Sequence, residues 1–293
     1  MAKTLLFVSF LMSALYLNAE QTFTAVEMSS GFTQDVICEN KDNLASNVTH
    51  SPVAGYQGLD GYAFVFYTSD VDSKGALCGP DGTFSSKRTG ATFKVNPAGL
   101  NALVLKSFLM NNAPIPGAIT TGELVFKAPI AAKSIYVVGT SAEGDSELAI
   151  TINYSDGTSA ENTITMYDWG SSSSAATSAA VVTDLGRMAA IKNWAGEAGH
   201  VDAYNFKLYE LAVNTDNTRQ IKSVGVKLNT VGRCASVFAV STSNDVVAGI
   251  EGISADSAVP VGYYTLDGHF LSTPVKGLNI VKYSDGTAAK VMY

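Results

Sequence analysis

The side chains best suited to contact a small polar ligand gather between residues 167 and 206 of this 293-residue chain. Both tryptophans of the protein lie there, in a stretch that has no regular apolar period. Flat aromatic rings stack against sugar rings, while neighbouring carboxylates, amides and guanidinium groups hydrogen-bond to hydroxyls. We therefore predict a ligand-binding loop, lined by Trp194, Trp169, Arg187, Asp168, Tyr167 and Tyr204.

The two tryptophans carry different alternatives. Trp169 follows a predicted strand and is explained equally well as a cap over the end of a hydrophobic core. Trp194 is flanked by Lys192, Asn193 and Gly196, which favours an exposed ring. Trp194 is therefore the stronger candidate for ligand contact.

Residues with the chemistry of catalysis lack the spacing that catalysis needs. His50, His200 and His269 stand in no catalytic motif, and no Gly-x-Ser-x-Gly sequence occurs. Several carboxylates precede glycine, as in Asp156-Gly157, where turn formation accounts for them. The sequence predicts a non-catalytic protein, and a glycan hydrolase or esterase of unrecognised type is the alternative.

Metal sites have equally little support. The segment from Asp70 to Asp81 begins like a calcium-binding loop, but Lys74 stands where an oxygen ligand belongs. No Cys/His spacing suits zinc. We expect no cofactor, and only a structural calcium ion held by scattered loop oxygens stays open.

The elements that position these residues are predicted from the segment 133–170. Leu148, Ile150 and Ile152 alternate with polar residues, and Asp156-Gly157 then favours a tight hairpin turn. The return strand carries Ile164 and Met166, and a further β-rich run covers 134–138. Three neighbouring strands with one apolar face need a second sheet to cover it, so we predict an all-β fold, an antiparallel β-sandwich.

The rest of the sandwich domain, residues 20–242, reads as short strands between loops. The loops are expected at 39–61, at 75–90 and throughout the Ser/Ala-rich stretch 170–204. The remaining strands are expected at 23–28, 32–37, 62–67, 100–110, 205–213, 221–228 and 235–241.

The amino terminus and the overall charge indicate export. Residues 1–19 resemble a secretory signal peptide, with Lys3 before an apolar run that is too short to span a membrane. Cleavage leaves 18 basic against 26 acidic residues, a net charge of −8, with no basic cluster. We therefore expect a secreted or outer-surface protein with no membrane span and no nucleic-acid partner.

Three cysteines give two alternatives. Export permits one disulfide, and Cys38 with Cys78 is the simplest pairing by distance along the chain. Three separate, mostly buried thiols, with Cys234 the third, are the other reading. The pairing stays open, as does the oligomeric state.

The carboxyl-terminal part is a separate small β unit. Residues 243–260 form a linker without period, and residues 261–293 then carry two hairpins that turn at Asp267-Gly268 and at 284–286. This tail resembles the C-terminal sorting domain of Bacteroidetes type IX secretion substrates. The resemblance rests on Tyr263 to Leu271, Pro274, Lys276 to Val281 and Lys290 to Met292. It implies recognition by a secretion machinery, and whether the tail is then cleaved stays open.

The region from Ser30 to Ser241 resembles an exported, galactose-binding-like (jelly-roll) module of the same bacteria. The matching residues are 30–36, 62–67, 152–158, Asp168-Trp169, 185–187, 208–210 and 237–241. The resemblance implies recognition of carbohydrate or a surface glycan, without naming it. We thus expect an exported glycan-binding protein; the alternative is a structural or adhesive surface protein without a small-ligand site.

Overall fold

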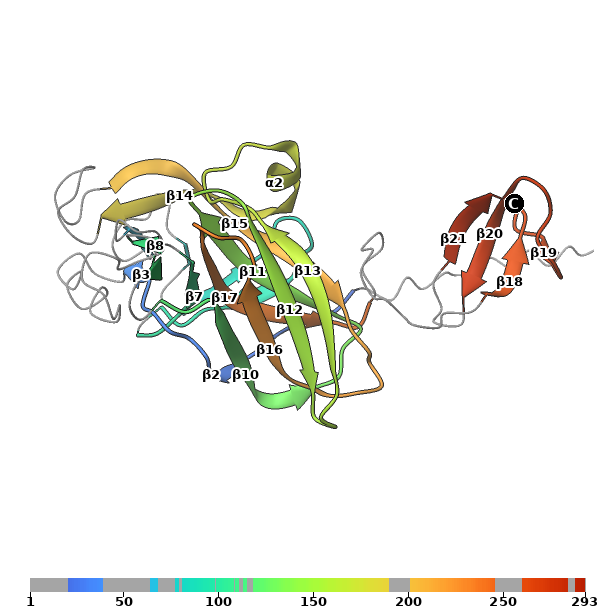
Figure 1. Cartoon of the computed structure of the whole chain (residues 1–293), viewed down its shortest axis with the longest axis horizontal. Helices are drawn as coiled ribbons and strands as arrows, with labels where there is room; N and C mark the ends of the chain where they lie inside the picture. The colour runs from blue at the N-terminus through green and yellow to red at the C-terminus, as the bar shows by residue number, and fades with distance from the viewer. Residues whose placement is uncertain are drawn as a thin grey trace, which may run out of the picture. The chain divides into compact units, whose positions relative to one another are not determined.

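The computed structural model describes residues 21–38, 64–67, 77–78, 81–97, 99–107, 109–110, 113–114, 118–189, 201–245, 260–283 and 288–292. The chain divides into two compact units, Met1–Glu251 and Gly252–Tyr293. The larger unit is built almost entirely of strands in two main sheets (Figure 1). The prediction of an all-β, antiparallel sandwich is confirmed.

The five-stranded sheet has the order β13-β12-β16-β10-β2. The predicted hairpin, β12 and β13, lies at the edge of this sheet. Its strands pair from Ser146↔Met166 to Asn153↔Ser159 without a register shift. Gly157 has a φ of +88°, the left-handed conformation that its turn requires. The strands span Ser159–Met166 (β13), Ser146–Tyr154 (β12), Ile221–Leu228 (β16), Thr121–Ile130 (β10) and Met28–Ser30 (β2).

The eight-stranded sheet has the order β1-β17-β11-β15-β14-β4-β3, and β7 pairs with β17 beside β1. All of these pairs are antiparallel except β3 with β4. Its strands are Phe23–Ala25 (β1), Cys234–Ser243 (β17), Ser134–Ala142 (β11), Val201–Asn214 (β15), Ala180–Ala189 (β14), Phe64–Tyr67 (β4), Ile37–Cys38 (β3) and Leu103–Lys106 (β7).

Two predictions about which strands lie side by side are wrong, because the chain passes from one sheet to the other at two places. Strand β11 was expected beside β12, but it lies in the other sheet because residues 143–145 cross between the sheets, with positive φ at Glu143 and Gly144. The two strands expected at 23–28 and 32–37 are three short ones, β1, β2 and β3. The chain changes sheets between β1 and β2, and Gly31, whose φ is +116°, follows β2 against the backbone of β10.

The eight-stranded sheet is buried on both faces. One core lies between the two sheets and includes Val137 of β11, while a second core on the far side includes Val138. A small hairpin, β5 (Thr83–Ser85) and β6 (Thr92–Lys94), covers that far side with the fully buried Phe93. A plain loop was expected over 75–90, and β5 corrects that expectation in part. A further two-stranded pair is β8 (Leu109–Met110) with β9 (Ala113–Pro114).

The Ser/Ala-rich stretch, expected to lack regular structure, forms helix α2 (Ser174–Ala179) followed by β14. Ser173 caps the helix, since its hydroxyl accepts a hydrogen bond from the Ala176 amide. Strand β14 pairs with β15 through four register shifts, and this irregularity explains why its sequence shows no clean alternation.

The cysteine positions exclude the simplest disulfide. Cys78 and Cys234 are both free and buried, so a Cys38–Cys78 bond is not formed. Burial, with Asp81 nearby, raises the pKa of the Cys78 thiol to about 11.

The smaller unit is a four-stranded sheet of order β19-β18-β20-β21. The buried Asn279 amide holds the loop before β20, accepting from the Val275 amide and donating to the Val275 and Gly277 carbonyls. The strands span Phe270–Leu271 (β19), Pro260–Tyr264 (β18), Leu278–Tyr283 (β20) and Ala288–Met292 (β21).

Candidate functional site

Four of the residues predicted to line a ligand site lie near one another around the crossover from β13 to β14. The backbone of Asp168 forms a bridge with Ser141 of β11, which ties the crossover to the eight-stranded sheet. The Arg187 guanidinium carbon lies 5.1 Å from the centre of the Trp169 ring. The Tyr167 ring packs edge-on against Tyr209 of β15 at 5.5 Å. Arg187 is thus brought beside Trp169, whereas Tyr167 packs against the core between the two sheets.

The environment of Trp169 supports the core alternative. Only 3% of its surface is exposed, and its ring lies 4.9 Å from that of Phe206 within the core on the far side of the eight-stranded sheet. The guanidinium of Arg187 lies over both rings, 4.4 Å from the centre of Phe206. A ring covered in this way has little surface left for stacking against a sugar.

Asp168 is committed to the fold as well. Its carboxylate accepts hydrogen bonds from the Gly144 and Gly170 amides, both at 2.8 Å, and its own amide donates to Asp145. The Tyr209 hydroxyl donates to the Asp168 carbonyl at 2.6 Å, and burial raises the pKa of that hydroxyl, which keeps it protonated. These bonds fasten the crossover. Of the other predicted site residues, Tyr204 contributes its backbone to β15, and Trp194 lies outside the described residues.

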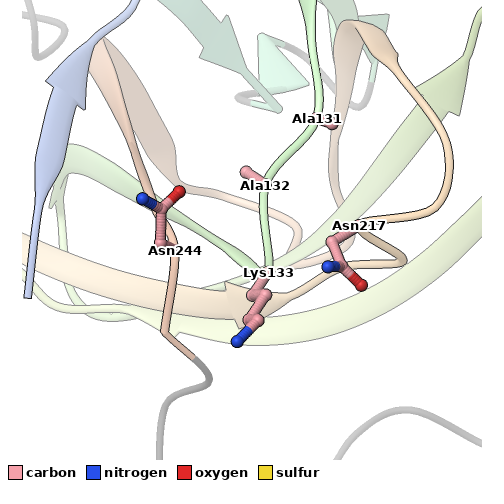
Figure 2. A pocket seen from close by; sticks show the side chains of 5 residues that line it. All are labelled: Ala131, Ala132, Lys133, Asn217 and Asn244. Carbon is pink, nitrogen blue, oxygen red and sulfur yellow. The ribbon is translucent and has the colours of Figure 1, made fainter. Parts of the chain in front are cut away.

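A pocket of about 240 Å³ opens at another place on the sandwich, where three segments distant in sequence meet (Figure 2). It is lined by Ala131, Ala132 and Lys133 of the β10–β11 connection, Asn217 of the β15–β16 loop and Asn244 after β17. Figure 2 shows the Lys133 side chain between the two amides. None of these residues was predicted to contact a ligand.

Hydrogen bonds join the segments that line this pocket. The Thr215 hydroxyl donates to the Ala132 carbonyl at 2.5 Å, and its amide donates to the Lys133 carbonyl at 2.8 Å. The Lys133 amide donates in turn to the Ser243 carbonyl at 2.9 Å. The three segments are thus fixed relative to one another, which is the preorganisation that a binding site needs.

The polar groups that line the pocket are largely uncommitted. Within the described part of the chain, the Lys133 ammonium and the Asn217 amide form no hydrogen bond or ion pair. Asn244 donates to the Thr22 hydroxyl at 2.8 Å, which leaves its amide oxygen as an acceptor. One cation and two amides can hydrogen-bond to hydroxyl or carboxylate oxygens.

A network of charged side chains stiffens the loops beside the pocket. Arg219 forms ion pairs with Asp216 at 3.2 Å and with Asp156 at 3.5 Å, and it lies over the Tyr154 ring. Hydrogen bonds from the Thr218 side chain and backbone lower the pKa of the Asp216 carboxyl. Because both carboxylates are engaged with Arg219, this network positions the loop that carries Asn217.

Residues that could hold a metal ion do not assemble in the described regions. No group of three or more His, Cys, Asp or Glu side chains there could hold a metal ion. The His269 side chain lies 3.3 Å from the Asp267 carboxylate in an exposed turn of the smaller unit, and His50 and His200 lie outside the described residues. Of the calcium-like segment, Asp81 is described, and its carboxylate accepts from the Thr83 amide.

Comparison with known proteins adds no relative. The chain matches no known protein family and none of the curated proteins searched. Across the residues described, no helix is long and apolar enough to cross a membrane. Function must therefore be argued from the site itself.

Proposed function

We propose that this protein is an exported, non-catalytic binding protein whose sandwich takes a carbohydrate or surface glycan through its loops. The observation that carries the proposal is the pocket at Lys133, Asn217 and Asn244, where uncommitted polar side chains surround a hydrogen-bonded floor. Such groups suit the hydroxyl-rich surface of a sugar. The aromatic loop around Trp194 remains the predicted stacking partner.

The direct test is a glycan array, with polysaccharide pull-down, on the chain without its signal peptide. Lys133→Ala and Asn217→Ala should each weaken binding by about tenfold, because each loses a hydrogen bond to the ligand. Asn229→Ala, at the opposite end of β16, is the matched control and should bind as the wild type does. Trp194→Ala should cost about 1–3 kcal/mol of affinity if its ring stacks on the sugar.

The outcomes separate the candidate surfaces. Loss of binding in the pocket variants alone places the ligand at the pocket, and loss in Trp194→Ala alone places it at the aromatic loop. No binding to any glycan would contradict the proposal and favour a structural or adhesive surface protein.

The smaller unit supports a separate proposal about a protein partner. Large apolar side chains are exposed on both edge strands of this 42-residue unit, Gly252–Tyr293: Phe270 of β19 is 64% exposed and Met292 of β21 is 71% exposed. Such a surface suits contact with another protein. We propose the secretion machinery as its partner, in line with the resemblance of this tail to a sorting domain. Deletion of residues 252–293 should then leave the protein inside the cell, as fractionation would show.

A further inference from the structure

The pocket at Lys133, Asn217 and Asn244 carries a single formal charge, the ammonium of Lys133. The mature chain around it has 18 basic and 26 acidic residues, so the pocket is a local positive site on an acidic protein. Water solvates an exposed ammonium well, so the charge alone does not require a ligand. What this charge can bind therefore depends on the groups placed around it.

The carboxylates that adjoin the lining residues in sequence do not neutralise Lys133. Asp216 forms an ion pair with Arg219 at 3.2 Å. Asp245 is held through its backbone, since its carbonyl accepts a hydrogen bond from the Ser134 hydroxyl at 2.6 Å. Among the residues that the structure describes, no carboxylate lies within ion-pair distance of the Lys133 ammonium. The ammonium is thus open to an anionic group of a ligand.

The two amides offer opposite hydrogen-bonding groups to the same space. Asn244 donates through its amide nitrogen to the Thr22 hydroxyl, which leaves the amide oxygen as its free end. Figure 2 shows this oxygen on the side of Ala132 and Lys133. No hydrogen bond within the described chain holds the Asn217 amide, so its NH2 group can turn towards a ligand. The pocket therefore combines two donors, one of them charged, with one acceptor.

This set of groups matches a carboxylate that has a hydroxyl close to it. A carboxylate only accepts hydrogen bonds and carries the charge opposite to that of Lys133. A hydroxyl donates one hydrogen bond, which suits the oxygen of Asn244. A neutral sugar would use the amides but would leave the ammonium without a counter-charge. Sugars that carry both groups on one ring are uronic acids.

We propose that this pocket takes a uronic acid residue of an acidic glycan, with the carboxylate on Lys133 and Asn217 and a ring hydroxyl on Asn244. Uronic acid recognition rests on the function proposed above, glycan binding, and specifies the class of sugar. At about 240 Å³ the pocket is smaller than the roughly 300–1,000 Å³ of sites for drug-sized molecules, which suits one sugar residue. The methyl groups of Ala131 and Ala132 offer apolar surface to the C–H groups of the ring.

Methyl esterification removes the charge of a uronic acid and keeps the rest of the sugar, so each acid and its ester form a matched pair of probes. Oligosaccharides of homogalacturonan, alginate and hyaluronan, each beside its methyl ester, are titrated calorimetrically into the full mature chain at about pH 7, where the carboxylates are ionised. At least one acid should bind about tenfold more tightly than its ester, because its carboxylate accepts charge-assisted hydrogen bonds.

Substitutions of Lys133 locate the carboxylate. Lys133→Gln should weaken binding of that acid by about tenfold, to the level of its ester, and should change binding of the ester by less than about twofold. Lys133→Arg keeps the charge and should keep the preference for the acid. Lys227→Gln, the same change of charge at the opposite end of β16, should alter neither affinity by more than about twofold. Both lysines are exposed, so these changes remove no buried contact.

Each result supports or overturns uronic acid recognition. A preference for the acid that disappears in Lys133→Gln alone supports it. A chain that binds glycans but prefers no acid to its ester overturns it and leaves glycan binding standing. A preference that Lys133→Gln does not reduce also overturns it, as does binding of dextran sulfate in place of the uronic acids. A chain that binds no glycan, acidic or neutral, overturns glycan binding as well.

Discussion

At the scale of single residues, polar side chains of the same kind make contacts within the fold in one place and, among the described residues, make none in another. Asp168 and Arg187 looked like ligand contacts in the sequence, yet one fastens a crossover and the other covers buried rings. Lys133 and Asn217 were not predicted as ligand contacts, yet their side chains line a pocket and, among the described residues, form no hydrogen bond or ion pair. Hydrogen-bond commitment, rather than residue type, separates the two groups.

Trp169 tests this distinction through stability. Trp169→Ala should lower the free energy of unfolding by about 3–5 kcal/mol, because it removes a large side chain from a closed core. Urea unfolding measures the loss, and Trp169→Phe should recover most of it. If Trp169→Ala instead unfolds like the wild type but loses glycan binding, then Trp169 is a ligand contact and the core assignment is wrong.

At the scale of elements, a carboxyl group fixes the β5–β6 hairpin to the eight-stranded sheet. Glu210 of β15 has no exposed surface, and its carboxylate accepts from the Thr89 hydroxyl at 2.9 Å. Arg88 lies 3.6 Å from the other carboxylate oxygen and also donates to the Glu210 carbonyl. Burial raises the pKa of Glu210 above its ordinary value of 4.5, against the lowering effect of the hydroxyls of Ser86 and Thr89 and of Arg88.

This shift sets the direction of a pH effect. A pKa raised by folding means that the folded chain holds the proton more tightly than the unfolded chain does. The contribution of Glu210 to stability is therefore full below pH 4.5 and is lost as the pH rises through the raised pKa. Glu210→Gln does not titrate, so its stability should lack this loss.

Urea unfolding of both proteins from about pH 4 to pH 8 checks the expectation. The free energy of unfolding of Glu210→Gln, relative to the wild type, should rise over this range. Parallel curves for the two proteins would show that Glu210 does not titrate as its burial implies.

A strand is easier to predict from sequence when one of its faces meets solvent, because only then do polar and apolar residues alternate. Strand β12 alternates because its outer face meets solvent in part, with Glu147 exposed and Thr151 and Asn153 half-buried, so its pattern and the Asp156-Gly157 turn predicted the hairpin correctly. Strand β17 is buried along its whole length, and periodicity recovered only part of it. The pocket was out of reach because Lys133, Asn217 and Asn244 come together only once both sheets are assembled.

At the scale of the whole molecule, the chain consists of two units that differ in how many apolar side chains they bury. The larger has two cores, whereas Val281 is the one buried hydrophobic residue in the described part of the smaller. A four-stranded sheet with so little buried apolar surface is only marginally stable by itself.

Removing the smaller unit tests this independence. A chain that ends at Glu251 should melt within about 3 °C of the full chain, because the described core residues of the sandwich all lie before it. Differential scanning calorimetry measures both. A drop of 10 °C or more would show that the tail completes the fold of the larger unit.

The pairing of β1 with β17 has a consequence for the order of events during synthesis. Phe23–Ala25 leaves the ribosome before its partner, Ser241–Ser243, which is made more than 200 residues later. The opening strand must wait, unpaired, while the rest of the unit is translated, and closure of the sheet is a late step with a large loop entropy. A chaperone or a transport channel that holds extended chain therefore meets this protein with its amino-terminal strand still free.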